Sequence, residues 1–333
     1  MKPSTILVIG DGAWGTALAL VLLGNGHRVR LWGPFPDALD LLRKDHENKA
    51  FLPGVPLPGD LDITADRTAA TAGIDAAVLA VPTRYFRDTI AGFRDCLPAT
   101  CRLISVAKGL DRTTHQRMTE VAAGTLEGRS VAALSGPSHA EEVARSIPTA
   151  VTVAAVNPDD ARFFQDLFSA GRFRVYTSTD IRGVELGGAL KNVIAVAVGV
   201  SDGLGFGDNT RAALIARGLA EMTRLGCALG ARASTFSGLS GMGDLIVTCT
   251  SRHSRNRGFG ERIGRGESAS DILASTHQAV EGAWNCEAAR DLARQTGVEV
   301  PITDQVYAMV HEQRRPELAV ECLLNRESKP ESD

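Results

Sequence analysis

The chain has 333 residues, of which 44% are hydrophobic, and its 36 basic and 39 acidic side chains give a formal net charge of −3. This length suggests roughly two domains of about 150 residues each. The near balance of charge argues against broad attraction to nucleic acid or to an anionic membrane, because such attraction needs clustered excess Lys and Arg.

Targeting and metal-binding signals are weak along the whole sequence. The only apolar run near the N-terminus, Ile6–Ile9, is too short for a signal peptide, and the longest uncharged apolar stretch, Val193–Val200, is too short for a membrane span. The cysteines are scattered without a CxxC pair, and the histidines lack metal-ligand spacing. We therefore expect a cytoplasmic protein with no membrane span, no disulfide framework and no metal.

From Thr5 to Tyr176, short β-branched runs alternate with longer segments of helical periodicity. The predicted strands are Thr5–Ile9, Arg28–Trp32, Ala76–Val81, Leu103–Ala107, Val131–Leu134, Val151–Val156 and Arg172–Tyr176. Continuous apolar runs suit a sheet that is covered on both faces, and the alternation implies strand–helix–strand crossovers. This half of the chain is predicted to be α/β.

Beyond Val184 the strand signals stop, and helical periodicity with glycine interruptions takes over. One helix is predicted to start at a cap formed by Asn209 or Thr210 and to end at Gly230. Its apolar residues share one face: Leu214, Ile215, Leu219, Met222 and Leu225. We predict an α/β domain over residues 1–188 and an all-α domain over residues 189–333, with a helix that can continue across the boundary.

The segment Gly10–Gly15 reads G-x-G-x-x-G, directly after a predicted strand and before a predicted helix, Thr16–Leu23. Gly10 permits a tight turn, Gly12 lets the backbone approach a pyrophosphate, and Gly15 allows close helix packing. The helix N-terminus then faces the anion. In this context the motif predicts a Rossmann-type dinucleotide-binding domain rather than an ordinary glycine-rich turn.

The second predicted strand lacks the acidic residue that binds the adenosine ribose hydroxyls in many such domains. It ends in Trp32-Gly33-Pro34-Phe35, and Asp37 follows several residues late, after a second proline. No arginine that could accept a 2′-phosphate stands at that place either. The choice between NAD and NADP is therefore open, and the missing carboxylate slightly favours tolerance of a 2′-phosphate.

Three further features place charge or polarity at predicted strand ends or in apolar surroundings. Lys108 and the segment Ser135–Ser138 follow predicted strands, at the edge where open α/β sheets bind ligands. Lys191 lies in a helical segment, Leu186–Val200, so apolar that it should be buried. Desolvation lowers the pKa of a lysine toward the range of a general acid or base. The alternatives are a solvated loop lysine, an ordinary turn, and a Lys191 that reaches solvent or pairs with Glu185.

Two segments in the second half are also candidates for a binding site. Asp244 is framed by glycines in Gly241–Asp244 and is suited to hold a lysine or a hydroxyl. The run Ser251–Arg257 precedes a helical segment and suits a phosphate monoester, through a guanidinium and backbone N–H groups. An isolated basic run is otherwise solvated surface. No G-x-S-x-G segment is present, which argues against acyl transfer.

Many of these segments occur together, in the same order, in one family. They are Gly10–Leu18, Phe51–Gly54, Ala80–Thr83, Ala107–Gly109, Leu134–Ser138, Val184–Val193, Asp202–Asn209, Gly243–Leu245, Thr248–Ser251, Ser254–Arg257 and Val280–Gly282. On these residues the sequence resembles the soluble bacterial NAD(P)-dependent glycerol-3-phosphate dehydrogenases. The glycine motif is generic, whereas the segments around Lys191 and Arg255 are specific.

The resemblance implies reversible reduction of dihydroxyacetone phosphate to sn-glycerol 3-phosphate by NADH or NADPH, which supplies phospholipid synthesis, in a homodimer. By resemblance, Lys191 is the proton donor and acceptor, and Lys108 and Asp244 assist it. The implied substrate site comprises Lys108, Gly136, Ser138, Lys191, Asp244, Ser254, Arg255 and Asn256. The implied cofactor site comprises Gly10, Gly12, Ala13, Trp14, Gly15, Pro34, Lys108, Ala140, Arg255 and Glu281.

The chain departs from the family pattern at two places. Gly33–Phe35 stands where members often carry Arg or His, so cofactor preference is not transferred. Phe51 stands where tyrosine is common, so any hydrogen bond from that hydroxyl is lost. A β-hydroxyacid or ketopantoate-type dehydrogenase and a non-catalytic dinucleotide sensor are the competing hypotheses. The segment Leu186–Asn209 disfavours the first, and the presence of Lys191 and Arg255 disfavours the second.

Overall fold

The computed structural model describes residues 2–276, 279–328 and 330–331. The chain forms two compact units, one of Met1–Gly188 with Ser234–Asp244 and one of Ala189–Ala233 with Leu245–Asp333. Residues 234–244, which come from the helical half of the sequence, group with the first unit. The helix Ile181–Gly203 carries the chain across the boundary after Gly188, and the shorter helix Asp244–Thr250 carries it across the boundary after Asp244.

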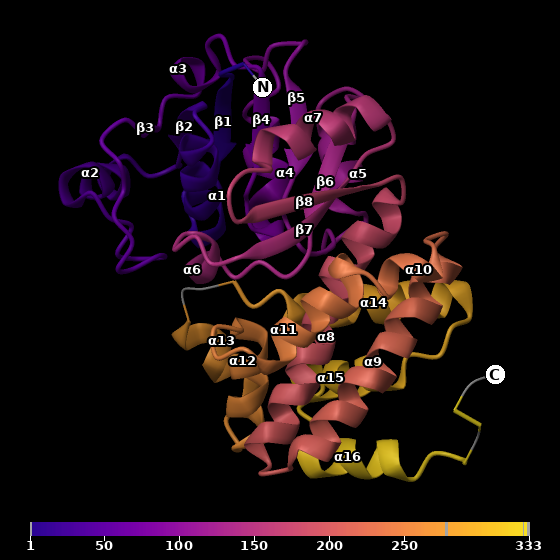
Figure 1. Ribbon diagram of the computed structural model, residues 1–333. Helices are drawn as coiled ribbons and strands as arrows, with labels where there is room; N and C mark the ends of the chain where they lie inside the picture. Colours follow the sequence, from indigo (N-terminus) through magenta and orange to yellow (C-terminus); the bar gives the residue numbers. More distant parts are fainter. Residues whose placement is uncertain (1, 277–278, 329, 332–333) are drawn as a thin grey trace. The chain divides into compact units, whose positions relative to one another are not determined.

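The first unit contains an eight-stranded sheet in the order β3-β2-β1-β4-β5-β6-β7-β8 (Figure 1). The strands are β1 Thr5–Ile9, β2 Arg28–Trp32, β3 Asp62–Thr64, β4 Ala76–Leu79, β5 Arg102–Ser105, β6 Val131–Ser135, β7 Thr149–Ala154 and β8 Phe173–Ser178. Neighbouring strands pair in parallel except β6 and β7, which are antiparallel. The predicted α/β organisation is confirmed.

Several details of the sheet differ from the prediction. Strand β7, predicted over Val151–Val156, spans Thr149–Ala154, and β8, predicted over Arg172–Tyr176, spans Phe173–Ser178. Strand β3, of three residues, was not predicted, because it is shorter than any recognisable apolar alternation. Strands β4 and β5 end two residues earlier than predicted, at Leu79 and Ser105, because the apolar run continues past the last paired residues, with Val81 and Val106 buried outside the strands. The antiparallel β7 follows a connection whose only helix, Ala140–Val143, has four residues, too few for a crossover helix.

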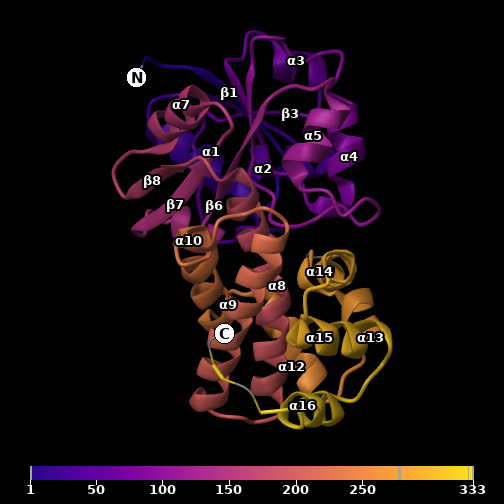
Figure 2. The same cartoon turned by 90° about the vertical axis from the view of Figure 1, so that its right-hand side faces the viewer.

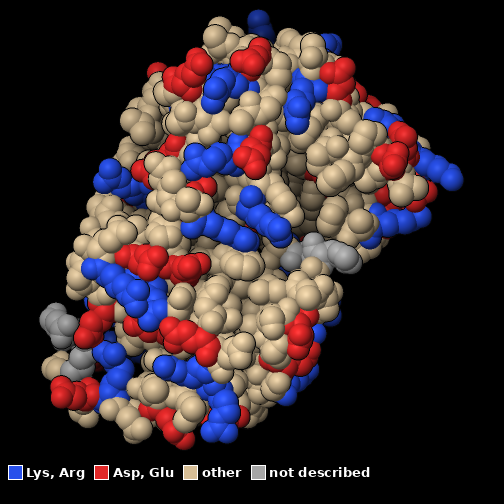
Figure 3. All heavy atoms as spheres, turned by 180° about the vertical axis from the view of Figure 1, so that it is seen from behind, with Lys and Arg blue, Asp and Glu red and all other residues tan. Residues whose placement is uncertain are grey.

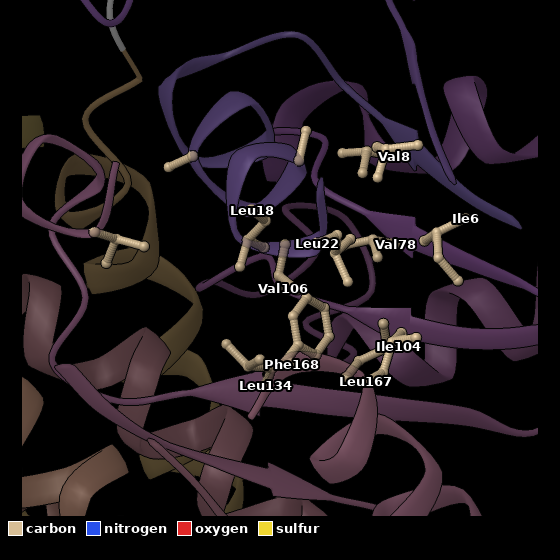
Figure 4. Close-up of a cluster of buried hydrophobic side chains, with 14 of the residues drawn as sticks. Ile6, Val8, Leu18, Leu22, Val78, Ile104, Val106, Leu134, Leu167 and Phe168 are labelled. Carbon is tan, nitrogen blue, oxygen red and sulfur yellow. The ribbon is translucent and has the colours of Figure 1, made fainter. Parts of the chain in front are cut away.

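Helices cover both faces of this sheet. They are α1 Ala13–Gly24, α2 Pro36–Asp45, α3 Arg67–Thr71, α4 Thr83–Ala91, α5 Met118–Thr125, α6 Ala140–Val143 and α7 Pro158–Phe168. Alternate strand residues point to opposite faces, so Ile6 packs in one buried cluster and Leu7 in another. In the first cluster, Leu18 of α1 and Phe168 of α7 pack against the strands (Figure 4). This packing fixes the position of α1, the helix that follows the glycine motif.

The regular elements described after β8 are all helices (Figure 2). They are α8 Ile181–Gly203, α9 Asp208–Ala228, α10 Ala233–Phe236, the π-helix η1 Leu239–Gly243, α11 Asp244–Thr250, α12 Arg255–Gly264, α13 Ala269–Ser275, α14 Gly282–Thr296, α15 Pro301–His311 and α16 Pro316–Leu324. The predicted helical second half is confirmed. The predicted cap of α9 was wrong, because Gly207 precedes its first residue and Asn209 and Thr210 lie in its first turn. Gly230, with φ of +84°, follows the end of α9 as predicted.

Helix α8 is long and apolar enough to cross a membrane by length and composition, yet its apolar window is 100% buried inside the protein. This combination is typical of a core helix. On the face shown in Figure 3, basic and acidic side chains are interspersed. The surface there has the mixed character expected from a net charge of −3.

Candidate active site

The glycine motif forms the loop between β1 and α1. Protein atoms leave no room for a side chain at two of its glycines but leave room at the third. A Cβ atom on Gly10 would lie 2.5 Å from the carbonyl oxygen of Ala80, and one on Gly15 would lie 2.0 Å from the carbonyl oxygen of Gly10. A Cβ atom on Gly12 would meet no atom within 4 Å. The protein itself therefore excludes side chains at Gly10 and Gly15. Only an approaching ligand would exclude one at Gly12, as in a pyrophosphate cradle.

Asn48 forms hydrogen bonds with this loop, and the sequence analysis did not identify it as a site residue. Its Nδ2 donates to the carbonyl oxygen of Asp11 at 2.7 Å and to Thr16 Oγ1 at 2.9 Å, and Asn48 is fully buried. Gly10 N also donates to the carbonyl oxygen of Trp32 at 2.9 Å. Asn48 lies beyond α2 in no recognisable motif, so no sequence signal could have identified it. The cradle is thus preorganised by bonds to two separate segments, at Asn48 and at the end of β2.

Gly12→Ala is expected to raise the dissociation constant for NADH by about tenfold or more without lowering the melting temperature. Gly12 has φ of −69° and ψ of 175°, which alanine adopts readily, and no protein atom opposes the added methyl group. Gly15→Ala should instead lower the melting temperature, because its methyl group would collide with the Gly10 backbone. Thermal melting and fluorescence titration with NADH check both variants. Unchanged NADH affinity in Gly12→Ala would contradict the cradle assignment.

Four of the predicted site residues form one hydrogen-bonded cluster within the first unit. Lys108 Nζ donates to the carbonyl oxygen of Gly136 at 2.8 Å, to Ser138 Oγ at 3.1 Å and to Asp244 Oδ2 at 2.8 Å. The side chain of Lys108 is 18% exposed and that of Asp244 is 1% exposed. Strands β5 and β6 are neighbours, so the segments after them meet at one sheet edge, and the π-helix η1 brings Asp244 to the same place.

Ser135 lies beside this cluster; it belongs to the candidate segment Ser135–Ser138 but is not among the site residues that the family resemblance implies. Its Oγ is buried and has no hydrogen-bond partner among the residues that the structure describes. A Cβ atom on Gly188 would lie 2.6 Å from Ser135 Oγ and 3.5 Å from Lys108 Cγ. The absence of a side chain at Gly188 therefore lets the backbone of α8 approach the cluster closely.

Lys191 is 5% exposed, as the apolar character of α8 predicted. Its Nζ donates to Thr248 Oγ1 at 2.7 Å. Glu185, the alternative partner, accepts hydrogen bonds from Thr119 N at 2.9 Å and from Arg117 Nη1 at 2.6 Å. Burial raises the pKa of the Glu185 carboxyl, and the Arg117 charge opposes that shift. Thr248 therefore contacts the candidate catalytic lysine. In the sequence analysis, Thr248 appeared only in the family segment Thr248–Ser251.

The predicted phosphate-binding segment forms the first turn of α12. Ser254 Oγ caps the helix by accepting from Arg257 N at 3.2 Å. Asn256 Nδ2 donates to Asn192 Oδ1 at 2.9 Å, and Asn256 Oδ1 accepts from Gly282 N at 2.9 Å. The side-chain amide of Asn256 is therefore already engaged in linking α8, α12 and the start of α14.

The arginines of this turn have different environments. Arg257 Nε donates to Asp202 Oδ2 at 2.7 Å, in a structural ion pair. Arg255 is exposed and forms no ion pair with any residue in the described part of the chain. An exposed guanidinium on the first turn of a helix is well placed to bind an anion.

The remaining predicted cofactor residues lie on separate segments. Trp14 is half-buried in the first turn of α1, beside Ala13, and Pro34 is exposed just after β2. Ala140 is the buried first residue of α6, and Glu281 is the cap residue of α14. Among residues 2–276, 279–328 and 330–331, no group of three or more His, Cys, Asp or Glu side chains is arranged to hold a metal ion.

Comparison with known proteins adds independent information. Two family models match, described as NAD-dependent glycerol-3-phosphate dehydrogenase N-terminus over residues 5–161 and C-terminus over residues 180–321. A glycerol-3-phosphate dehydrogenase (NAD(P)+) of Geobacillus kaustophilus is 48% identical over 331 residues, covering 98% of this chain and 96% of the relative.

Solved structures give the same result. The crystal structure of glycerol-3-phosphate dehydrogenase from Coxiella burnetii matches with a TM-score of 0.93 and 40% identity, covering 97% of this chain and 99% of that one. A ketopantoate reductase from Ralstonia eutropha covers 95% of this chain and 99% of its own with a TM-score of 0.61, but at 13% identity. That second likeness concerns the fold alone.

Proposed function

The chain belongs to the NAD(P)-dependent glycerol-3-phosphate dehydrogenase family, and we propose that it reversibly reduces dihydroxyacetone phosphate to sn-glycerol 3-phosphate. It is an oxidoreductase that acts on a CH–OH group, with NADH or NADPH as the reductant. The observation that carries the proposal is family likeness over 98% of the chain, together with a buried lysine and a lysine–aspartate cluster.

The chemistry requires a proton source and stabilisation of negative charge. When bound, a reduced nicotinamide would supply the hydride for the ketone carbon, and negative charge would then build on the carbonyl oxygen. We assign Lys191 Nζ as the group that gives this oxygen a proton during reduction and takes it back during oxidation. Its burial excludes water, and Thr248 Oγ1 orients the amine by accepting a hydrogen bond at 2.7 Å.

Lys108 is assigned a fixed positive charge near the reacting oxygen. An ammonium group has three N–H donors, and the three acceptors Gly136 O, Ser138 Oγ and Asp244 Oδ2 hold it in one position. The Asp244 carboxylate keeps this cation stable in a largely desolvated place. A preorganised charge costs no rearrangement when negative charge develops in the transition state.

The substrate phosphate is assigned to the first turn of α12. Arg255 supplies an unpaired guanidinium, and Ser254 fixes the turn that carries it. Asn256 bonds Asn192 and Gly282 and so positions both, and the second N–H of its amide is assigned to the substrate phosphate. Binding energy from the remote phosphate would fix the carbonyl for hydride transfer.

Arg255→Ala is expected to raise the KM for dihydroxyacetone phosphate by about tenfold to a hundredfold with a smaller change in kcat, the cost of one charge-assisted contact. Arg252→Ala removes an exposed arginine three residues earlier and serves as the matched control, with KM unchanged. Steady-state kinetics with varied substrate measure both. If Arg255→Ala changed only the NADH dissociation constant, the phosphate assignment would be wrong.

The proposal also covers the roles of the two domains, the cellular location and the oligomeric state of the enzyme. Residues 1–188 would bind the dinucleotide, and residues 189–333 would supply Lys191 and the phosphate-binding turn. We place the enzyme in the cytoplasm as a homodimer that supplies sn-glycerol 3-phosphate to phospholipid synthesis. Family membership supports this setting, and analytical ultracentrifugation of the purified chain tests the dimer.

A further inference from the structure

The carboxylate missing from the end of β2 has a counterpart in the loop that follows the neighbouring strand, β1. Asp11, the first variable residue of the glycine motif, directs its side chain to Gly33, the residue that follows β2. A Cβ atom on Gly33 would lie 2.7 Å from Asp11 Cγ and 2.8 Å from Asp11 Oδ2. The Asp11 carboxylate therefore occupies the space in which a side chain at residue 33 would begin.

Strand register explains why the two residues meet. Strands β1 and β2 are parallel neighbours, and Ile9 of β1 pairs with Trp32 of β2. The residues that follow both strands consequently emerge at the same sheet edge. In dinucleotide-binding domains, this edge holds the acidic group that accepts hydrogen bonds from the adenosine ribose.

The main chain at Asp11 is held firmly. Its carbonyl oxygen accepts hydrogen bonds from Asn48 Nδ2 at 2.7 Å and from Thr16 Oγ1 at 3.3 Å. On the other strand, Gly33 N donates to the carbonyl oxygen of Thr64 at 3.3 Å. These bonds fix the backbone on both sides of the carboxylate, so its position is set before any ligand binds.

The carboxylate of Asp11 has no cationic partner among the described residues. Arg30, the last arginine of β2, instead pairs with Asp62 at 3.4 Å and donates to the carbonyl oxygen of Ala70 at 3.2 Å. Burial raises the pKa of the Asp11 carboxyl, and its own backbone N–H opposes the shift. A half-buried carboxylate without a counter-charge is costly to the fold, whereas ribose hydroxyls would satisfy it.

We propose that Asp11 accepts a hydrogen bond from the adenosine ribose 2′-hydroxyl and thereby makes this enzyme prefer NAD(H) to NADP(H). This inference rests on the proposed function, because it assumes a dinucleotide bound at the glycine motif. A 2′-phosphate at the same place would face the Asp11 carboxylate, so like charges would repel. This proposal runs against the slight preference for 2′-phosphate tolerance drawn from the sequence, because the loop after β1 supplies a carboxylate that the end of β2 lacks.

The first test compares cofactor binding without substrate, by titrating nicotinamide fluorescence. Wild-type protein is expected to bind NADH at least about tenfold more tightly than NADPH, and Asp11→Asn should reduce that ratio by about tenfold. Asp37→Asn is the matched control, because it removes an exposed carboxylate from the first turn of α2, which follows β2. Equal binding of both cofactors by wild type, or loss of the ratio in Asp37→Asn alone, would overturn the inference.

A second test isolates the single hydroxyl. Wild-type protein should bind the 2′-deoxyadenosine analogue of NADH about tenfold more weakly than NADH, whereas Asp11→Ser should bind the two alike. A wild-type protein indifferent to the 2′-hydroxyl would refute the role of Asp11. If catalysis with dihydroxyacetone phosphate persisted in that case, the proposed function would stand. Failure to bind either cofactor would instead refute the proposed function.

Discussion

Lys191→Met is expected to lower kcat by at least about a hundredfold while leaving the NADH dissociation constant nearly unchanged. Methionine has a similar length and suits the buried site, where the lysine is 5% exposed, but it has no proton to give. The loss should therefore appear in the chemical step. Stopped-flow measurement of NADH oxidation, with saturating substrate, separates that step from product release.

Two further variants make this prediction specific. Thr248→Val removes the acceptor of the Lys191 hydrogen bond and should lower kcat less than Lys191→Met does, because the amine remains. Thr248→Ser keeps the hydroxyl and should recover most of the activity. Turnover of Lys191→Met near that of wild type would remove Lys191 from the mechanism.

Asp244→Ala is expected to lower kcat/KM by about tenfold to a hundredfold and the free energy of unfolding by about 2 kcal/mol. The carboxylate is 1% exposed and lies 2.8 Å from Lys108 Nζ, so its removal leaves a largely desolvated ammonium without its counter-ion. Lys108 would retain Gly136 O and Ser138 Oγ as acceptors. The cation would then be less well fixed where negative charge develops.

Asp244→Asn separates charge from shape. It keeps an oxygen acceptor and a similar volume, so kinetics close to those of Asp244→Ala would show that the negative charge matters. Denaturant unfolding and steady-state kinetics measure both properties. Wild-type stability and kinetics in Asp244→Ala would contradict the role of the Lys108–Asp244 pair.

The sequence predicts the fold well where the signal is local. The apolar strand residues and the glycine motif predicted seven of the strands in the eight-stranded sheet, with small errors at their ends. Strand β3 and the antiparallel direction of β7 could not be predicted. Both depend on tertiary contacts, since three residues carry no periodicity and pairing direction depends on the path of the connection.

In the candidate site, too, features with a local sequence signal were predictable and contacts between distant residues were not. The burial of Lys191 was predictable, because the apolar residues that bury it flank it in α8. The bond from Lys108 to Asp244 joins residues 136 positions apart, so only the folded chain shows it. Asn48 bonds to Asp11 across 37 positions and had no signal at all.

The question of cofactor preference depends on a contact that the sequence alone does not show. The end of β2 lacks a carboxylate, and only the folded chain shows that Asp11, in the loop after β1, lies against Gly33. Gly33 and Asp11 are 22 positions apart, and the role proposed for Asp11 depends on their contact in the folded chain. A side chain larger than hydrogen at residue 33 would collide with the Asp11 carboxylate.

The most direct test of the assigned reaction is the absorbance of reduced nicotinamide when purified protein meets dihydroxyacetone phosphate. Parallel reactions contain NADH or NADPH, and dihydroxyacetone without phosphate is the control. The account predicts rapid oxidation that depends on the phosphate and is faster with NADH at subsaturating cofactor. Confirmed cofactor binding with no oxidation of either cofactor would contradict the assignment and would favour the dinucleotide sensor.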